Sequence, residues 1–249
     1  MKTIKKAIIF TLCLFPIALI SGALSGAYLL EMLPQEMTDE VMTQIPGKGL
    51  LVALTAIQTV GYAVVCGFFG YILSDKTGLN KPLKPDTYKS GKTLAISAIL
   101  GIIYSLDPWT FGEFIDRIGP ETVKITPIRI WASILYGGII EEILLRLFMM
   151  SLIVFIFNKL FNKKKGTVPD IIYVISNIIS ALLFAAGHLP ATAVLIGELT
   201  PLIVFRCFLL NGAFGFVFGH LYRKYGIIYS MMSHSVVHIV SITVWTIFI

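Results

Sequence analysis

Long apolar stretches separated by short polar ones set the pattern of this chain. A helix needs about 20 predominantly apolar residues to cross the roughly 30 Å hydrocarbon core of a bilayer. Seven stretches approach or exceed this length, at residues 7–30, 50–74, 93–107, 129–158, 171–197, 200–222 and 226–249. The pattern therefore predicts an all-α fold, a polytopic transmembrane helical bundle with about seven spans.

Composition supports this fold class and excludes others. Hydrophobic residues make up 56% of the chain and charged residues only 14%, whereas a soluble domain carries roughly 25% charged residues. The net charge of +6 reflects the membrane topology of the chain and its attraction to anionic lipid. We therefore expect the lipid bilayer as a partner and no nucleic acid.

The basic residues predict the orientation of the bundle. Of the 20 Lys and Arg, 14 precede the first span or follow the second, fourth and sixth, whereas the alternate loops hold only Lys48, Arg117, Lys124 and Arg129. The positive-inside rule then places the N-terminus in the cytoplasm and, with seven spans, the C-terminus outside. The first span resembles a secretory signal, but its removal would spoil this alternation, so we expect an uncleaved anchor. The Lys- and Ile-rich composition indicates a bacterial cell membrane.

Ionisable residues within the spans divide the chain into two halves. Residues 1–127 contain none well inside a span, whereas residues 128–249 contain nearly all of them. Such groups cost a few kcal/mol each in a membrane and persist mainly where they serve a function. We therefore expect spans one to three, residues 1–127, to accompany a functional core formed by residues 128–249.

The fourth span carries two adjacent carboxylates and a guanidinium. Glu142 and Arg146 are four residues apart and share a helical face, in the favourable acid-before-base order. Glu141 points about 100° away and has no partner nearby in the sequence. An unpaired carboxylate at low dielectric can serve as a general base. The same residues also fit a structural ion pair with a second Glu at a helix contact.

Three histidines lie on two further spans. Pro190 follows His188 closely, which predicts that the helix breaks there, while His234 and His238 are four residues apart on one face. That spacing suits two ligands of one metal, although the Glu of the zincin helix is absent. Convergence of Glu141 with the three imidazoles would fit water activation, a metal site or a proton relay in a transporter.

The sixth span contains two further polar residues. Asn211, together with Gly212, Gly215 and Gly219, indicates a close-packing helix surface. Arg206 fits either a membrane-interface position or a buried ion pair.

These residues resemble the CAAX-protease and bacteriocin-processing (ABI) family of intramembrane proteases. The family pattern is Glu-Glu-x-x-x-Arg, then Phe-x-x-x-His, then His-x-x-x-Asn or His-x-x-x-Asp, on successive transmembrane helices. Matching positions are Glu141-Glu142 with Arg146, Phe184 with His188, and His234. The resemblance covers residues 128–245 and does not extend to the first half.

The resemblance implies an intramembrane endopeptidase that hydrolyses membrane-associated proteins or peptides by glutamate-activated water, without a cofactor. Glu141 and His188 become the pair that activates the water, and His234 becomes an oxyanion donor. Glu142 and Arg146 become the supporting pair. His238 stands where the family has Asn or Asp, and we assign it to the catalytic set as the second donor.

Three alternatives use the same residues. A catalytically silent relative would bind and regulate a membrane partner or act in bacteriocin immunity. A zinc-dependent protease would use Glu141, His188, His234 and His238 as ligands. A proton-coupled transporter would show related repeats in its two halves, which their unequal charge content disfavours.

The depths expected for Glu141 and His234 in the membrane differ. With a rise of 1.5 Å per residue, their positions in the fourth and seventh spans match only to within roughly 6 to 7 Å.

Overall fold

A computed structural model describes residues 2–115, 117–162 and 166–249. Lys163, Lys164 and Lys165, which belong to the basic residues of the charge pattern, lie outside the described residues, as does Asp116. The elements are α1 (Lys2–Met32), α2 (Gln35–Gln44), α3 (Lys48–Lys76), α4 (Thr87–Ser105), α5 (Asp107–Phe111), the 3-10 turn η1 (Pro120–Thr122), α6 (Pro127–Ala132), the π-helices η2 (Ser133–Glu141) and η3 (Ile143–Met150), α7 (Ser151–Phe161), α8 (Asp170–Ile196), α9 (Pro201–Cys207), the π-helix η4 (Phe208–Ala213), α10 (Phe214–Tyr225) and α11 (Ile227–Phe248).

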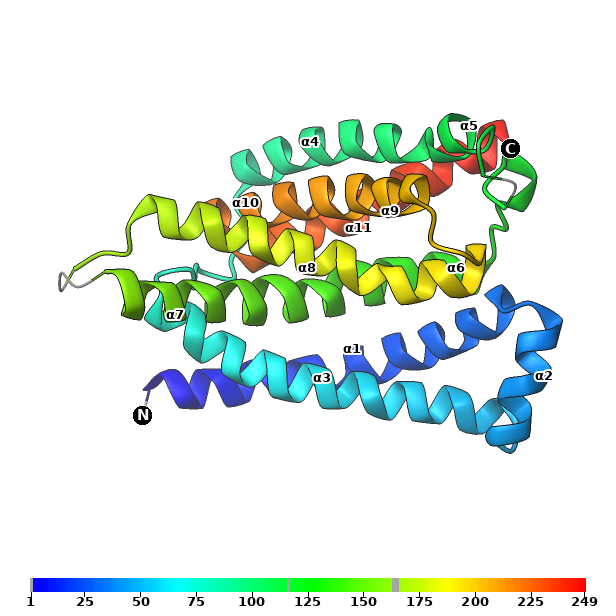
Figure 1. The fold of residues 1–249 in the computed structure, drawn as a ribbon. Coiled ribbons are helices and arrows are strands. Elements are labelled where there is room, and N and C mark those ends of the chain that lie inside the picture. The colour runs from blue at the N-terminus through cyan, green and yellow to red at the C-terminus, as the bar shows by residue number, and fades with distance from the viewer. Residues whose placement is uncertain (1, 116, 163–165) are drawn as a thin grey trace.

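The predicted polytopic helical bundle is confirmed, and no strand occurs in the described ranges. Six helices are long and apolar enough to cross a membrane, and they coincide with six of the predicted spans. The remaining predicted span, residues 129–158, lies in α6, η2, η3 and α7, which follow one another without a break from 127 to 161. The N- and C-termini lie at opposite ends of the bundle (Figure 1), as an odd number of spans requires.

Helices of the first half flank those of the second. Figure 1 shows α1 and α3 side by side, joined through α2 at the right of the view. This pair packs against η2 and η3, while α4 packs along α11. Close approach of α1 to α3 depends on Gly22, where an added Cβ would lie 2.7 Å from the Cα of Ala56. The first half therefore forms part of the wall around the second.

The outer surface is apolar and the interior contains small polar groups. Large side chains such as Leu12, Ile57 and Phe161 are exposed, whereas Ser97 and Ser233, both fully buried, form a hydrogen bond of 2.8 Å between α4 and α11. Extended apolar surface marks contact with a membrane or partner, and polar side chains hydrogen-bond across helices inside a bundle. This is the distribution expected of a multi-pass membrane protein.

The prediction that the helix breaks near His188 is wrong. Helix α8 continues through Pro190 to Ile196. Transmembrane helices tolerate proline because neighbouring helices and Ser or Thr side chains compensate for the disturbed backbone bonds. The Thr192 hydroxyl donates to the His188 carbonyl at 2.8 Å within the same stretch of helix.

Candidate active site

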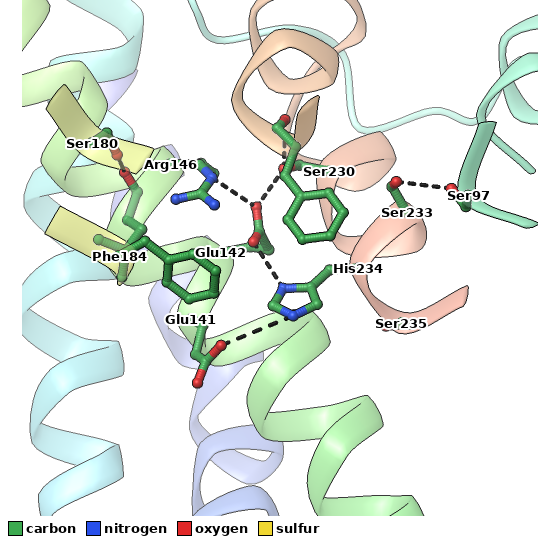
Figure 2. A network of polar contacts seen from close by, with 12 residues as sticks. Ser97, Glu141, Glu142, Arg146, Ser180, Phe184, Ser230, Ser233, His234 and Ser235 are labelled. Carbon is green, nitrogen blue, oxygen red and sulfur yellow. Dashed lines mark hydrogen bonds and ion pairs between the residues drawn. The ribbon is translucent and has the colours of Figure 1, made fainter. Parts of the chain in front are cut away.

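Glu142 lies at the centre of a buried polar network that joins η3 to α11 (Figure 2). Its Oε2 lies 3.4 Å from Nε of Arg146, and both side chains are fully buried. Nδ1 of His234 lies 2.9 Å from Oε1, and the Ser230 hydroxyl donates to Oε2. The pair expected from the four-residue spacing is therefore present, with two further partners that the spacing does not reveal.

Arg146 is held by its ion pair and by an aromatic face. Its guanidinium carbon lies 4.9 Å from the ring centroid of Phe184, within cation–π range. None of its nitrogens has a hydrogen-bond partner in the part of the chain that the structure describes, so the 3.4 Å contact with Glu142 is a charge interaction. Phe184 of the Phe-x-x-x-His motif thus contacts the Glu-Glu-x-x-x-Arg motif directly.

Glu141 lies between two imidazoles, on the far side of the His234 ring from Glu142 (Figure 2). Its Oε1 is 3.9 Å from Nε2 of His188, and its Oε2 is 4.0 Å from Nε2 of His234. These distances exceed those of direct hydrogen bonds. The Glu141 side chain retains 19% exposure, and that exposed part faces the cavity described below.

Two π-helices, η2 and η3, adjoin the glutamates of the fourth span. A π-turn bonds residue i to residue i+5, so it holds more residues per turn and rises less for each of them. Glu141 is the last residue of η2, and η3 begins directly after Glu142, so the α-helical rise used to estimate the depth of Glu141 does not apply to this stretch. Such segments occur often at functional sites.

Each imidazole, His188 and His234, makes a hydrogen bond through Nδ1. That bond determines whether its Nε2, which faces Glu141, is a donor or an acceptor. Nδ1 of His188 lies 2.9 Å from the Phe184 carbonyl, and a carbonyl only accepts, so the proton is on Nδ1. Nε2 of neutral His188 is therefore an acceptor directed at Glu141. Nδ1 of His234 likewise donates to the Glu142 carboxylate, so Nε2 of His234 becomes a donor only when the ring carries a second proton.

The ring of His238, the last of the predicted catalytic residues, lies in a stack with the ring of His234. It stacks on His234 with centroids 4.9 Å apart and meets Tyr104 edge-on at 6.2 Å. Gly137 leaves room for it, because a Cβ there would lie 2.8 Å from Nε2 of His238. At Gly138 the corresponding Cβ would lie 1.9 Å from a side-chain atom of α11. The two glycines thus allow α11 to bring its imidazoles up to η2.

These groups line a cavity of about 320 Å³ within the bundle. The cavity is bordered by all four predicted catalytic side chains, Glu141, His188, His234 and His238. Tyr104, Tyr136 and Asn211 also line it, while Phe218 stacks on His234 with centroids 4.5 Å apart. Sequence reasoning missed Ser230 and Tyr104. The only signal for Ser230 is its position four residues before His234, and none points to Tyr104.

The other two polar residues of the sixth span have separate partners. Arg206 forms a largely buried pair with Asp107 of α5, in which Nε lies 2.7 Å from Oδ1 and Nη2 contacts Oδ2. This settles the alternative left open by its sequence position. Asn211 donates to the Cys207 carbonyl at 2.9 Å within its own helix, and it also borders the cavity.

The zinc alternative requires at least three converging ligands. Zinc binds nitrogen and oxygen donors at about 2.0–2.2 Å. Among the residues that the structure describes, no three His, Cys, Asp or Glu side chains form a group that could hold a metal ion. The side chains as placed do not fit zinc, and we derive no step through a metal.

Replacement of Glu142 by Ala is expected to lower both folded yield and thermal stability in detergent. It leaves the Arg146 charge buried without a counterion and removes the acceptor for Ser230 and His234. Breaking a buried pair typically costs about 3–5 kcal/mol. The matched control is Glu198→Ala in the exposed loop after α8. A Glu142→Ala protein as stable as this control would show that Glu142 does not hold the network together.

Comparison with known proteins supports the motif assignment. Residues 124–240 match the family model described as type II CAAX prenyl endopeptidase Rce1-like. The matched range begins just before α6 and ends within α11. It therefore contains both glutamates and the arginine of the fourth span, together with the three histidines of the candidate site. Neither a curated protein nor a solved structure matches the chain.

Proposed function

We propose, from the match of residues 124–240 to the type II CAAX prenyl endopeptidase Rce1-like family model, that this protein is an intramembrane endopeptidase that uses a glutamate-activated water. The family supports protease activity in general. The finer assignment depends on one observation, the position of the Glu141 carboxylate between Nε2 of His188 and Nε2 of His234. Its substrates are membrane-associated peptides or proteins.

The gap between Glu141 and His188 suits a water molecule. The carboxylate and the Nε2 lone pair of His188 both accept hydrogen bonds, and they are 3.9 Å apart. A water between them donates one O–H to each and keeps an oxygen lone pair for attack on the scissile carbonyl. Glu141 is the general base, and His188 orients the water.

Each proton and bond can be followed through the reaction. As the new C–O bond forms, the water proton passes to Glu141 and the carbonyl electrons move onto its oxygen. Doubly protonated His234 donates its Nε2–H to this oxyanion, and the oxyanion balances the charge of the ring, because the Glu142 carboxylate already balances Arg146. When the tetrahedral intermediate collapses, the C–N bond breaks and Glu141 returns its proton to the leaving nitrogen. No covalent enzyme intermediate and no metal takes part.

A peptide-library assay tests this proposal. Purified protein in neutral lipid nanodiscs is incubated with membrane-associated peptides, and new termini are detected by mass spectrometry. We expect site-specific cleavage by wild-type protein and none by Glu141→Ala prepared in parallel. Equal cleavage by both proteins would assign the activity to a contaminant, and absence of cleavage by wild type would count against proteolysis.

The second candidate function is a catalytically silent regulator or immunity protein that binds a membrane partner. One observation favours it, because His238 occupies the position at which the family pattern has Asn or Asp. The same assay separates the two functions, since a silent relative retains bound peptides without cleaving them.

We also propose an orientation and a location. The multi-pass bundle has its N-terminus at one end and α2, α5 and the C-terminus at the other (Figure 1). The basic loops favour a cytoplasmic N-terminus, and the composition favours a bacterial cell membrane. Accessibility of single cysteines introduced at each end to a membrane-impermeant thiol reagent tests the orientation.

A further inference from the structure

A second and larger cavity adjoins the candidate active site. Its volume is about 580 Å³, and it lies at the end of the bundle where α1 and α8 finish and α5, α6 and α9 begin. Tyr28, Met32 and Tyr104 line both this cavity and the catalytic one. We call the larger cavity the vestibule. A peptide whose scissile bond reaches Glu141 can therefore extend into it.

Positive charge is concentrated in the vestibule. Among the residues that the structure describes, its lining contains four basic side chains, Arg117, Lys124, Arg129 and Arg206, and two acidic ones, Glu31 and Asp107. The loops at this end of the bundle are otherwise acidic. Three of their four basic residues nevertheless line this one cavity, with Lys48 as the exception.

Within the lining, the acidic groups are already engaged. Asp107 pairs with Arg206, and Glu31 accepts a hydrogen bond of 2.7 Å from the Thr126 hydroxyl. No carboxylate among the side chains that the structure describes lies within 4.0 Å of the guanidinium of Arg129.

Arg129 is also held in place. Its Nη1 donates to the Lys124 carbonyl at 2.5 Å, and its guanidinium carbon lies 5.1 Å from the Trp245 ring centroid. These contacts leave other guanidinium N–H groups available, and a fixed guanidinium binds a carboxylate through paired hydrogen bonds. A cavity lined by one sign of charge also concentrates the opposite charge within it.

We propose that the vestibule binds a carboxylate carried by the peptide substrate, through Arg129 and Lys124 with Arg117 at its edge. The carboxylate is either the peptide's C-terminus or an acidic side chain, since both present the same chemistry. This inference rests on the proposed function, because the vestibule gains a substrate only if the adjoining cavity is the active site. It adds a charge preference to that site.

Binding of three matched peptides tests the inference without relying on cleavage. They share one neutral sequence and end in a free acid, in an amide, or in an amide with one Glu placed near the end. Each carries a fluorophore and is titrated with Glu141→Gln protein in phosphatidylcholine nanodiscs. We expect the two carboxylate peptides to bind about tenfold or more tightly than the amide, since hydrogen bonds to charged groups have about this effect, and added salt to reduce the difference.

Variants identify the residues responsible. Arg129→Gln and Lys124→Gln are expected to reduce the carboxylate preference several-fold, whereas Arg129→Lys, which keeps the charge but not the paired hydrogen bonds, retains only part of it. Lys48→Gln is the matched control, because Lys48 is at the same end of the bundle but outside the vestibule. Preference for only one of the two carboxylate peptides would identify the C-terminus or the side chain as the group recognised.

Other results would overturn the inference. Equal binding of all three peptides is one, and a preference that Lys48→Gln reduces as much as Arg129→Gln is another. A preference that disappears in nanodiscs containing phosphatidylglycerol would instead assign the vestibule to lipid phosphate. Charge-dependent binding combined with absence of cleavage by wild-type protein would leave the vestibule assignment standing and remove the proposed proteolysis.

Discussion

Glu141→Gln is expected to reduce peptide hydrolysis by roughly a thousandfold, within the range for loss of a general base, while folded yield and thermal stability stay close to wild type. Gln keeps the shape of the side chain but does not take a proton from water. The nearest ring nitrogens lie 3.9 and 4.0 Å away, so the substitution breaks no direct hydrogen bond to either ring. The measurement is kcat/KM for one cleaved peptide, together with a thermal melt in detergent.

A matched control separates loss of the base from a general effect of removing charge. Glu198→Gln changes an exposed carboxylate in the loop after α8 and is expected to retain full activity. The assignment of Glu141 as the base fails if Glu141→Gln keeps activity within tenfold of wild type. It also fails if the melting temperature falls as far as the activity does, because the defect is then one of folding.

The spans were predictable because the bilayer imposes a length on every apolar helix. Residues 171–197 and 226–249 were expected as spans, and α8 and α11 differ from them by one residue at each end. The ion pair of Glu142 with Arg146 was predictable for a similar reason, since both residues belong to one helix and four positions place them on one face.

Contacts between distant parts of the chain were not predictable from spacing. Arg206 meets Asp107 across 99 positions, and a single sequence does not show which acid would face it. The depth mismatch between Glu141 and His234 assumed α-helical rise, and local apolar periodicity did not reveal the π-helices η2 and η3. The break expected at Pro190 was wrong because packing in the bundle outweighs the local preference of proline.

The largest effect after that of Glu141 is expected at His238. If this imidazole takes the place of the family's amide as an oxyanion donor, His238→Ala loses roughly a hundred- to a thousandfold in kcat, the usual result of deleting one such donor. His238→Asn keeps most of the activity, because an amide N–H supplies the same hydrogen bond. Folding should change little with Asn, since the ring contributes stacking on His234 and an edge contact with Tyr104 rather than an ion pair.

Comparison of the two variants also decides between an oxyanion donor and a metal ligand. A ligating imidazole is poorly replaced by an amide, so in a zinc enzyme His238→Asn would lose as much activity as His238→Ala. Chelation would then inactivate wild-type protein and added zinc would restore it. We expect the metal-free outcome, because the side chains that the structure describes form no group of three ligands that could hold a metal ion, and Glu141 stands about 4 Å from both facing rings, a gap that suits a water molecule. Stoichiometric zinc in active protein, together with an inactive His238→Asn variant, would reverse this conclusion and make Glu141 a ligand instead of the base.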